Sequence, residues 1–270
     1  MALLHVDFFS EVLGMCTQMD VILPQPSRGL IGMDTGKSEG KWKVMYLLHG
    51  LSDDHTIWQR RTSIERYAAG RNLAVIMPET QRGWYTDMNY GFKWFTFFTE
   101  ELPSICRSFF PNISDKREDT CVCGLSMGGY GALKLGMSCP EQFGYAASLS
   151  GAVDVAELCD KAEGEGKRYL EDVFGEAASV RGSNNDLFAL AGKLAQKSIK
   201  PKLYMCCGLQ DGLYWQNVRL RNLMKSLELP LTYEEENGTH EWAYWDMKIQ
   251  SVLSWLSKNS KGDAYGSDTQ

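Results

Sequence analysis

Short apolar runs, many of them ending in glycine or proline, alternate along the chain with longer segments of helical periodicity. Six runs have the length of a strand, and several carry Val, Leu and Ala without alternation, as parallel strands covered by helices on both faces do. They are Trp42–His49, Leu73–Pro78, Thr120–Gly124, Tyr145–Ser150, Lys202–Gly208 and Leu231–Glu236. Ahead of them, Val6–Gly14 and Cys16–Leu23 predict an antiparallel pair that turns near Gly14.

Helical periodicity fills the intervals between these strands. Helices are expected at Thr56–Gly70, Trp94–Phe110, Met127–Cys139, Trp215–Leu227 and Glu241–Leu256. The alternation predicts a doubly wound, mostly parallel sheet in a single α/β domain over residues 1–258. The interval 151–200 is too long for an ordinary connection, and its helical stretches, Val155–Val173 and Asn184–Gln196, predict a cap insertion over one end of the sheet. The polar residues 259–270 are expected to form a flexible C-terminal tail.

Length and composition narrow the class of protein. The chain has 270 residues, 44% of them hydrophobic, so it can bury a core without disulfide or metal support. Its 34 acidic residues outnumber its 28 Lys and Arg residues, which argues against binding a nucleic-acid backbone. No basic stretch followed by an apolar run opens the sequence, and the apolar runs are too short to cross a bilayer. We therefore expect a cytoplasmic protein without a nucleic-acid or membrane partner, with homo-oligomer formation left open.

The eight cysteines do not form a C-x-x-C pair, and two closely spaced sets lie within strand-like runs. A zinc site needs thiolates or imidazoles clustered at ligand spacing, which this pattern does not provide. Buried, reduced thiols are therefore expected, and no metal is predicted.

The strongest chemical signal is the sequence G-x-S-x-G formed by Gly124, Ser126 and Gly128. It follows a predicted strand and precedes a predicted helix, which is the context of a nucleophile elbow. In such an elbow the serine occupies a strained left-handed turn, and side chains two residues before and after it would collide with backbone. A phosphate-binding loop is disfavoured because no G-K-[ST] follows. A glycine-rich turn without chemistry is the alternative that the flanking elements disfavour.

A serine hydroxyl needs a base, normally histidine, and in elbow-containing sheets the acid and then the histidine follow the serine in the chain. Of the four histidines only His240 lies after Ser126, just beyond the last predicted strand. The acid is expected after the strand that follows the cap, where Asp211 stands, and its role is to orient His240. Four other Asp residues after Ser126 are less favoured as the acid, because they precede or lie within the cap or fall inside the final helix: Asp154, Asp172, Asp186 and Asp246.

The turn Leu48-His49-Gly50-Leu51 follows a strand and is the expected source of one oxyanion-hole donor. The backbone N–H groups of Leu51 and Met127 are the predicted donors, and His49 is expected to hold this loop. The neighbouring Asp53-Asp54-His55 sequence is interpreted as a helix N-cap with acidic residues in its first turn, in preference to a metal site.

Aromatic residues are frequent in the predicted loops, where each could belong to the core or contact a ligand. Trp84 and Tyr85, after a strand end, are the leading candidates for lining a substrate pocket. Trp215 and Trp242 are further candidates.

The Gly124–Ala132 elbow, the Leu48–Leu51 turn and the His240-Glu241-Trp242-x-Tyr244-Trp245-Asp246 ending resemble the esterase D-type branch of the α/β hydrolases. Within it, the chain is similar to bacterial tributyrin esterases and acetylesterases. The resemblance implies a Ser–Asp–His carboxylesterase that hydrolyses short acetyl or butyryl esters, including those of acetylated carbohydrates, without a cofactor.

Alternatives remain open at this point. Feruloyl esterases share the fold, and S-formylglutathione hydrolases belong to the wider family, although this chain departs from their usual pattern around Asp211 and His240. An acyltransferase with the same triad and a silent hydrolase fold that only binds ligands are less favoured.

Overall fold

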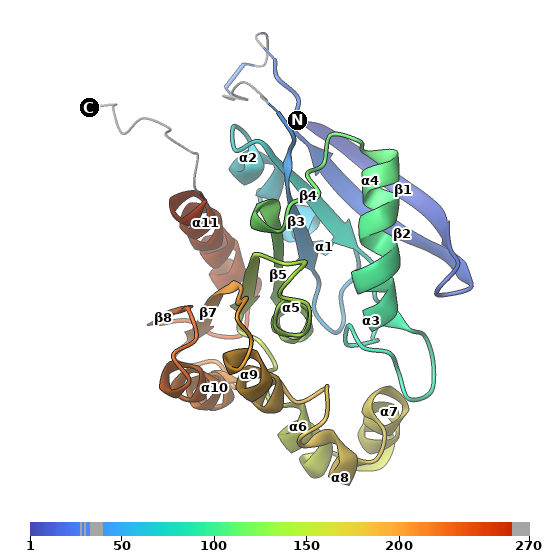
Figure 1. The fold of residues 1–270 in the computed structure, drawn as a ribbon, viewed down its shortest axis with the longest axis vertical. Coiled ribbons are helices and arrows are strands. Elements are labelled where there is room, and N and C mark those ends of the chain that lie inside the picture. Colours follow the sequence, from blue (N-terminus) through green and yellow to red (C-terminus); the bar gives the residue numbers. More distant parts are fainter. Residues whose placement is uncertain (28, 30, 33–39, 261–270) are drawn as a thin grey trace.

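One eight-stranded sheet runs through the molecule in the order β1-β2-β4-β3-β5-β6-β7-β8 (Figure 1). The structure is a computed structural model that describes residues 1–27, 29, 31–32 and 40–260. Strands β3 to β8 are parallel, whereas β2 joins β1 and β4 in antiparallel pairs. This confirms the predicted sheet. The strands are β1 Ala2–Ser10, β2 Met15–Leu23, β3 Lys43–Leu48, β4 Leu73–Pro78, β5 Thr120–Leu125, β6 Tyr145–Leu149, β7 Lys202–Gly208 and β8 Leu231–Glu236.

The N-terminal hairpin pairs as predicted, but its first strand lies earlier in the chain. β1 begins at Ala2, opposite Leu23, and ends at Ser10, opposite Met15. The turn closes with Gly14 N–H donating to the Ser10 carbonyl at 2.8 Å, and Gly14 has the positive φ of +66° that glycine adopts without strain. The expected strand Val6–Gly14 was therefore placed too late, because its last four residues form the turn.

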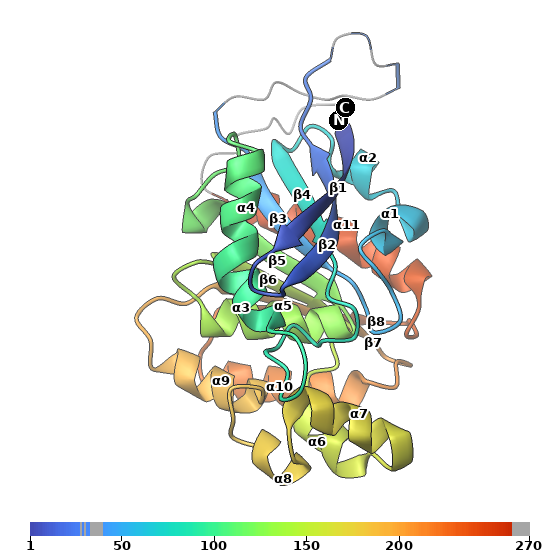
Figure 2. The same cartoon turned by 90° about the vertical axis from the view of Figure 1, so that its right-hand side faces the viewer.

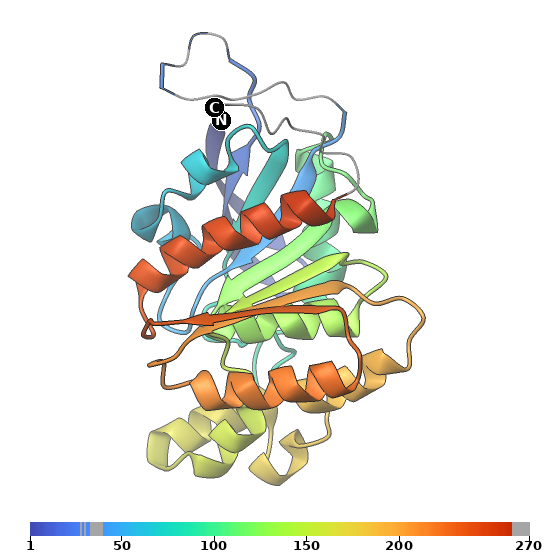
Figure 3. The ribbon, with the colours of Figure 1, turned by 90° about the vertical axis from the view of Figure 1, so that its left-hand side faces the viewer.

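Helices cover both faces of the sheet, because alternate residues of each central strand face opposite layers. Along β3, Val44, Tyr46 and Leu48 join one apolar cluster, while Met45 and Leu47 join the other. The first face carries α3 Trp94–Thr96, a π-helical turn Phe97–Glu101, α4 Leu102–Phe109, α5 Met127–Ser138, α9 Leu187–Ala195 and α10 Tyr214–Ser226. The second carries α1 Ile57–Arg61, α2 Ile64–Ala68 and α11 Trp242–Asn259, which crosses the sheet in Figure 3.

The single helix predicted over Thr56–Gly70 is wrong, because the segment breaks into α1 and α2 at Thr62. Thr62 has extended backbone, with φ −135° and ψ 173°. Its hydroxyl donates to the Trp58 carbonyl at 2.5 Å and accepts from the Ile64 N–H at 3.1 Å. One side chain thus satisfies the end of α1 and the start of α2, which a hydrophobic pattern does not reveal.

The insertion after β6 forms α6 Val155–Lys161, α7 Gly164–Phe174 and α8 Ala177–Val180, grouped at one end of the molecule (Figure 2). The stretch predicted as one helix over Val155–Val173 is therefore two. Helix α9, which was included in the predicted cap, packs against α5 and α10 and belongs to the layer that covers the sheet.

Helix α11 continues to Asn259, so the predicted tail starts inside a helix, and residues 261–270 lie outside the described part of the chain. Across residues 1–27, 29, 31–32 and 40–260, no helix combines the length and apolar character needed to span a membrane.

Candidate active site

Ser126 stands on the sharp turn between β5 and α5, at the carboxyl edge of the sheet. Its φ is +52° and its ψ is −117°, a strained backbone conformation for a residue other than glycine. The Ser126 N–H donates to Leu149 O at 3.0 Å, and Ser126 O accepts from the Ala152 N–H at 3.1 Å. These two bonds to the end of β6 and the chain after it hold the strained turn in place.

The elbow glycines are required by backbone contacts. A Cβ added to Gly124 would lie 2.4 Å from the Gly128 carbonyl oxygen. A Cβ on Gly128 would lie 2.6 Å from the carbonyl oxygens of both Leu48 and His49. Since backbone atoms cannot move aside as a flexible side chain can, the spacing of glycines around Ser126 follows from close packing of β5, α5 and the end of β3.

His240 reaches Ser126 from the loop between β8 and α11. Its Nε2 atom lies 3.0 Å from Ser126 Oγ, and its Nδ1 atom lies 2.9 Å from Asp211 Oδ2. The indole of Trp245 meets the imidazole edge to face, with ring centroids 4.8 Å apart. Two hydrogen bonds and one ring contact therefore fix the orientation of an imidazole that is otherwise partly exposed.

Asp211 follows β7 and has a buried carboxylate. Burial alone would raise its pKa, but the hydrogen bonds from His240 and from the Leu213 N–H, 2.8 Å from Oδ1, lower it below the ordinary value. Ser150, at the end of β6, also contributes to this lowering. The carboxylate therefore stays ionised and can stabilise a positive charge on His240.

Other carboxylates after Ser126 are engaged elsewhere. Asp154 pairs with Arg181 at 2.7 Å and with Arg219 at 3.1 Å, and Asp246 accepts from Tyr67 Oη at 3.0 Å. The structure thus brings together Ser126, His240 and Asp211, from the connections after β5, β8 and β7. Such a series can move a proton from a serine hydroxyl to an imidazole while a carboxylate holds the imidazole.

The two proposed oxyanion donors lie at adjacent strand ends. Met127 is the first residue of α5, so its N–H is one of the first-turn donors without an acceptor inside the helix. Leu51 follows Gly50 in the turn after β3. A Cβ on Gly50 would lie 2.8 Å from Leu125 Cδ1, which shows how closely this turn packs on the elbow.

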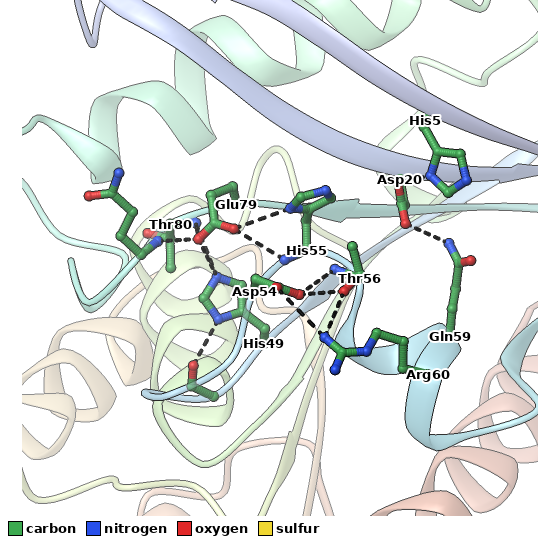
Figure 4. Close-up of polar contacts among 12 residues, drawn as sticks. His5, Asp20, His49, Asp54, His55, Thr56, Gln59, Arg60, Glu79 and Thr80 are labelled. Atoms are coloured by element: carbon green, nitrogen blue, oxygen red, sulfur yellow. Dashed lines mark hydrogen bonds and ion pairs between the residues drawn. The ribbon is translucent and has the colours of Figure 1, made fainter.

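A buried polar network supports the turn that carries Leu51 (Figure 4). His49 Nδ1 donates to the Gly50 carbonyl at 2.8 Å, and His49 Nε2 accepts from the Thr80 N–H at 3.1 Å. Glu79 Oε1 lies 3.2 Å from the same Nε2, and Glu79 Oε2 lies 3.2 Å from both the backbone nitrogen and Nδ1 of His55. The sequence-based expectation that His49 holds this loop agrees with these contacts.

The charge of this network is concentrated on Glu79. Burial would raise its pKa, but its close contacts with the rings of His49 and His55 outweigh burial and hold the pKa far below its usual range. The hydrogen bond to Glu79 also raises the pKa of His55. An ionised carboxylate therefore packs against the turn after β3, whose Leu51 N–H is the predicted oxyanion donor.

The expected N-cap at Asp53-Asp54-His55 with acidic residues in the first turn is wrong, because Thr56 is the N-cap residue of α1 and the first turn of α1 has no acidic residue. Asp54 instead lies just ahead of the helix. Its Oδ1 accepts from the Thr56 N–H at 2.9 Å and the Thr56 hydroxyl at 2.6 Å, and Thr56 is the N-cap residue of α1. Throughout the described ranges, no three His, Cys, Asp or Glu side chains are grouped so that they could hold a metal ion. The eight cysteines are unpaired, and Cys16 is exposed whereas most of the others are buried.

Trp84 and Tyr85 are core residues, contrary to the expectation that they line a pocket. Tyr85 is 0% exposed, and its hydroxyl donates to the His49 carbonyl at 2.9 Å. Trp84 is 3% exposed and donates from Nε1 to Tyr169 Oη at 2.8 Å, which ties the loop after β4 to α7. Both residues also have positive φ.

The other two aromatic candidates differ from each other. Trp215 is 70% exposed and lines a hollow of about 280 Å³ together with Gly212, the neighbour of Asp211. Trp242 is half-buried and packs edge to face against Trp58 and Trp245. Of the four aromatic candidates, Trp215 is the one with an exposed ring that lines a hollow.

Glu79 and Ser150 were not singled out from the sequence, and Trp245 was named only as part of the His240–Asp246 motif. The sequence could have indicated Glu79 and Ser150, because both directly follow strand ends at the same edge of the sheet as Ser126. The contact of Trp245 with His240 could not be predicted from the sequence, since it depends on how α11 packs.

Comparisons with known proteins show the family of this chain. Residues 10–256 match the family described as putative esterase. An acetyl esterase of Caldicellulosiruptor saccharolyticus is 34% identical over 267 residues, covering 96% of this chain and 100% of the relative. Among solved structures, the substrate-bound fluorophosphonate-binding serine hydrolase F of Staphylococcus aureus has a TM-score of 0.84 at 34% identity, covering 94% of this chain and 98% of that one. An S-formylglutathione hydrolase of the same organism has a TM-score of 0.81 at 33% identity, covering 94% and 98%. The chain has the α/β-hydrolase fold and belongs to this esterase family.

Proposed function

We propose that this esterase is a serine carboxylesterase that hydrolyses short-chain acyl esters through an acyl-enzyme on Ser126. The observation that carries the proposal is the continuous hydrogen-bonded series in which His240 lies 3.0 Å from Ser126 Oγ and 2.9 Å from Asp211 Oδ2. The similarity to an acetyl esterase and to a fluorophosphonate-binding serine hydrolase supports both the reaction and the nucleophile.

The reaction follows from the roles of the three residues. Ser126 Oγ attacks the ester carbonyl while His240 Nε2 takes its proton, and Asp211 stabilises the resulting imidazolium. The N–H groups of Leu51 and Met127 donate to the oxyanion of the tetrahedral intermediate. His240 then protonates the departing alkoxide, the acyl group stays on Ser126, and water activated by His240 releases the acid. No cofactor is required by these steps.

The proposed substrate class rests on the similarity to an acetyl esterase. The exposed ring of Trp215 offers a flat apolar face beside Gly212, which suits an alcohol moiety such as an acetylated sugar. Acetyl and butyryl esters are the proposed substrates.

Hydrolysis of p-nitrophenyl acetate, butyrate, octanoate and ferulate by the wild type and by Ser126→Ala tests the proposal. The expected result is a preference for acetate and butyrate, with the turnover of the variant lowered by about 10⁴ or more, as nucleophile loss does in a comparable triad. A variant that retains full turnover would refute the role of Ser126. A preference for octanoate or ferulate would refute the substrate class alone.

The second candidate is a thioesterase of the S-formylglutathione hydrolase type, which the 33% identity to such an enzyme favours. The same Ser126, His240 and Asp211 series would serve, because thiolate leaving groups depart more readily than alkoxides. Comparing kcat/KM for S-formylglutathione and p-nitrophenyl acetate separates the two. A value for the thioester at least a hundredfold higher would favour this second function.

A further inference from the structure

A second hollow, of about 480 Å³, lies away from the Ser–His–Asp series. It is enclosed by the loop after β4, by α3, by the C-terminal half of α5 and by α9 with the chain around it. Part of its wall is apolar and consists of Phe95, Met137 and Leu190. None of Ser126, His240 and Asp211 contributes to it, so its chemistry is independent of the proposed reaction.

Lys134, on α5, is the most deeply buried cation of this hollow, with 3% of its surface exposed. Its ammonium donates to Asn185 Oδ1 at 2.6 Å and to Thr86 Oγ1, and Thr86 in turn donates to Asn185 Oδ1 at 2.7 Å. The rings of Phe95 and Tyr130 lie 5.2 Å and 5.8 Å from Nζ. An ammonium has three N–H donors, so these two neutral oxygens leave one donor for a ligand.

The charge of Lys134 has no carboxylate partner in the part of the chain that the structure describes. The carboxylate that acts on it electrostatically is Asp87, whose two oxygens accept from the Thr96 N–H at 2.9 Å and the Thr96 hydroxyl at 2.8 Å. Burial accordingly lowers the pKa of Lys134 to about 7. A buried charge without a counter-ion is unfavourable, and an anion from solution would relieve it.

Two more lysines line the same hollow and are satisfied only by neutral oxygens. Lys193 donates to Asn184 Oδ1 at 2.8 Å, and Lys197 donates to the Ser138 carbonyl at 3.2 Å. With Lys134 they give three cations against the one carboxylate of Asp87. The interior of the hollow therefore attracts anions, in contrast to the chain's net charge of −6.

We propose that this hollow binds a short-chain carboxylate anion, whose head group pairs with Lys134 and whose alkyl chain lies against Phe95, Met137 and Leu190. The single free donor of the ammonium, the nearby side-chain amide of Asn185 and the apolar wall together favour a small organic acid over a bare inorganic anion. Lys193 and Lys197 strengthen the attraction from α9 and the residues after it.

Calorimetric titration with sodium butyrate, and with butyramide as its neutral isostere, tests this site in the intact protein. Butyrate is expected to bind at pH 6.5 and butyramide at least tenfold more weakly. Lys134→Met is expected to weaken butyrate binding at least tenfold, whereas Lys225→Met, an exposed lysine on α10, leaves it unchanged. Equal binding of butyrate and butyramide, or full affinity in Lys134→Met, would overturn the proposal.

The pH dependence provides a readout that a loss of packing would not reproduce. Bound carboxylate favours the charged ammonium, so affinity is highest below pH 7 and falls by up to tenfold per pH unit above it. The other titratable groups facing Lys134 are Asp87, Tyr130, Lys193, Lys197 and Cys139. Burial raises the pKa of Tyr130 well above its usual value and that of Cys139 to about 11, so neither changes charge between pH 6 and 9. In Lys134→Met the affinity should be flat from pH 6 to 9, and a decline equal to that of the wild type would contradict the assignment.

A second variant decides the question should Lys134→Met fail to fold, as judged by circular dichroism. Replacing Lys193 and Lys197 together by Met alters exposed side chains and leaves Lys134 in place. The expected result is butyrate binding weakened about tenfold, with less dependence on added salt. Unchanged affinity in this double variant would overturn the proposal.

Discussion

Glu79→Gln tests whether the buried network behind the turn after β3 positions an oxyanion donor. Glu79 lies 3.2 Å from His49 Nε2 through one oxygen and 3.2 Å from two nitrogens of His55 through the other. Gln retains the size of the side chain but has one oxygen instead of two. In the variant, the NH₂ group of the amide must face N–H donors where Glu79 has an oxygen. The side chain then holds His49 less firmly, and with it the peptide between Gly50 and Leu51.

The size of the effect follows from what the network supports. Removing an oxyanion donor outright lowers turnover by about 10²–10³. Because Glu79→Gln leaves the Leu51 N–H in the chain and only loosens its position, we expect kcat to fall by about 10–100-fold, with KM changed by less than about threefold. The lost charge-assisted hydrogen bond should also cost about 2 kcal/mol of folding stability.

Steady-state hydrolysis of p-nitrophenyl acetate, with thermal unfolding by circular dichroism as a check on folding, measures both effects. Glu118→Gln is the matched control, because this exposed residue lies just before β5 at the opposite edge of the sheet, and its rate should stay within about twofold of wild type. The pKa of Glu79 is held very low, so the defect of the Gln variant should be the same from about pH 5 to 9. A folded Glu79→Gln protein with wild-type kcat would refute the reasoning.

Three further predictions follow from the site. Gly128→Ala would place a Cβ 2.6 Å from the His49 carbonyl oxygen, so we expect a loss of about 3 kcal/mol in stability and at least tenfold in kcat, and an alanine variant as stable as wild type in urea titration would contradict the packing. Asp211→Asn keeps the shape of the acid but loses its charge, and kcat should fall about 10⁴-fold in ester hydrolysis; a loss below tenfold would show that another group orients His240. The pKa values of Glu79 and Asp211 are lower in the folded protein than their ordinary values of 4.5 and 3.8, so the stability that they contribute is present above those values and lost as pH falls through the folded ones. The free energy of unfolding should thus be steady from about pH 7 to 5.5 and decline below about pH 4.5, and a decline already complete at pH 6 would contradict these directions.

The sheet and the elbow could be predicted from the sequence because local rules decide them. The six parallel strands are apolar runs with turn residues at their ends, and the glycines beside Ser126 mark a turn in which no Cβ fits. The position of His240 followed from chain order, since three of the four histidines precede the elbow. The strands and the elbow reflect constraints within a few residues, whereas His240 was placed by the order of residues along the chain.

The remaining features depend on contacts between distant segments. The break in the helix at Thr62 comes from one hydroxyl that bonds both helices, which hydrophobic periodicity does not register. Trp84 and Tyr85 follow a strand end, but both rings are buried in the core and donate hydrogen bonds to Tyr169 and to the His49 carbonyl, respectively. The sequence shows Lys134 as a single cation within an apolar helix, which only weakly indicates a buried charge. Its lack of a counter-ion depends on the loop after β4, which packs against it in the folded protein.

Mass spectrometric mapping after reaction with a fluorophosphonate probe tests the central claim, that Ser126 is the nucleophile, most directly. We predict one adduct per chain, on the peptide that contains Ser126, and no adduct in the Ser126→Ala protein. The strong slowing of labelling in Asp211→Asn would link the adduct to the same hydrogen-bonded series. Labelling of another residue, or equal labelling of the Ser126→Ala protein, would contradict the account.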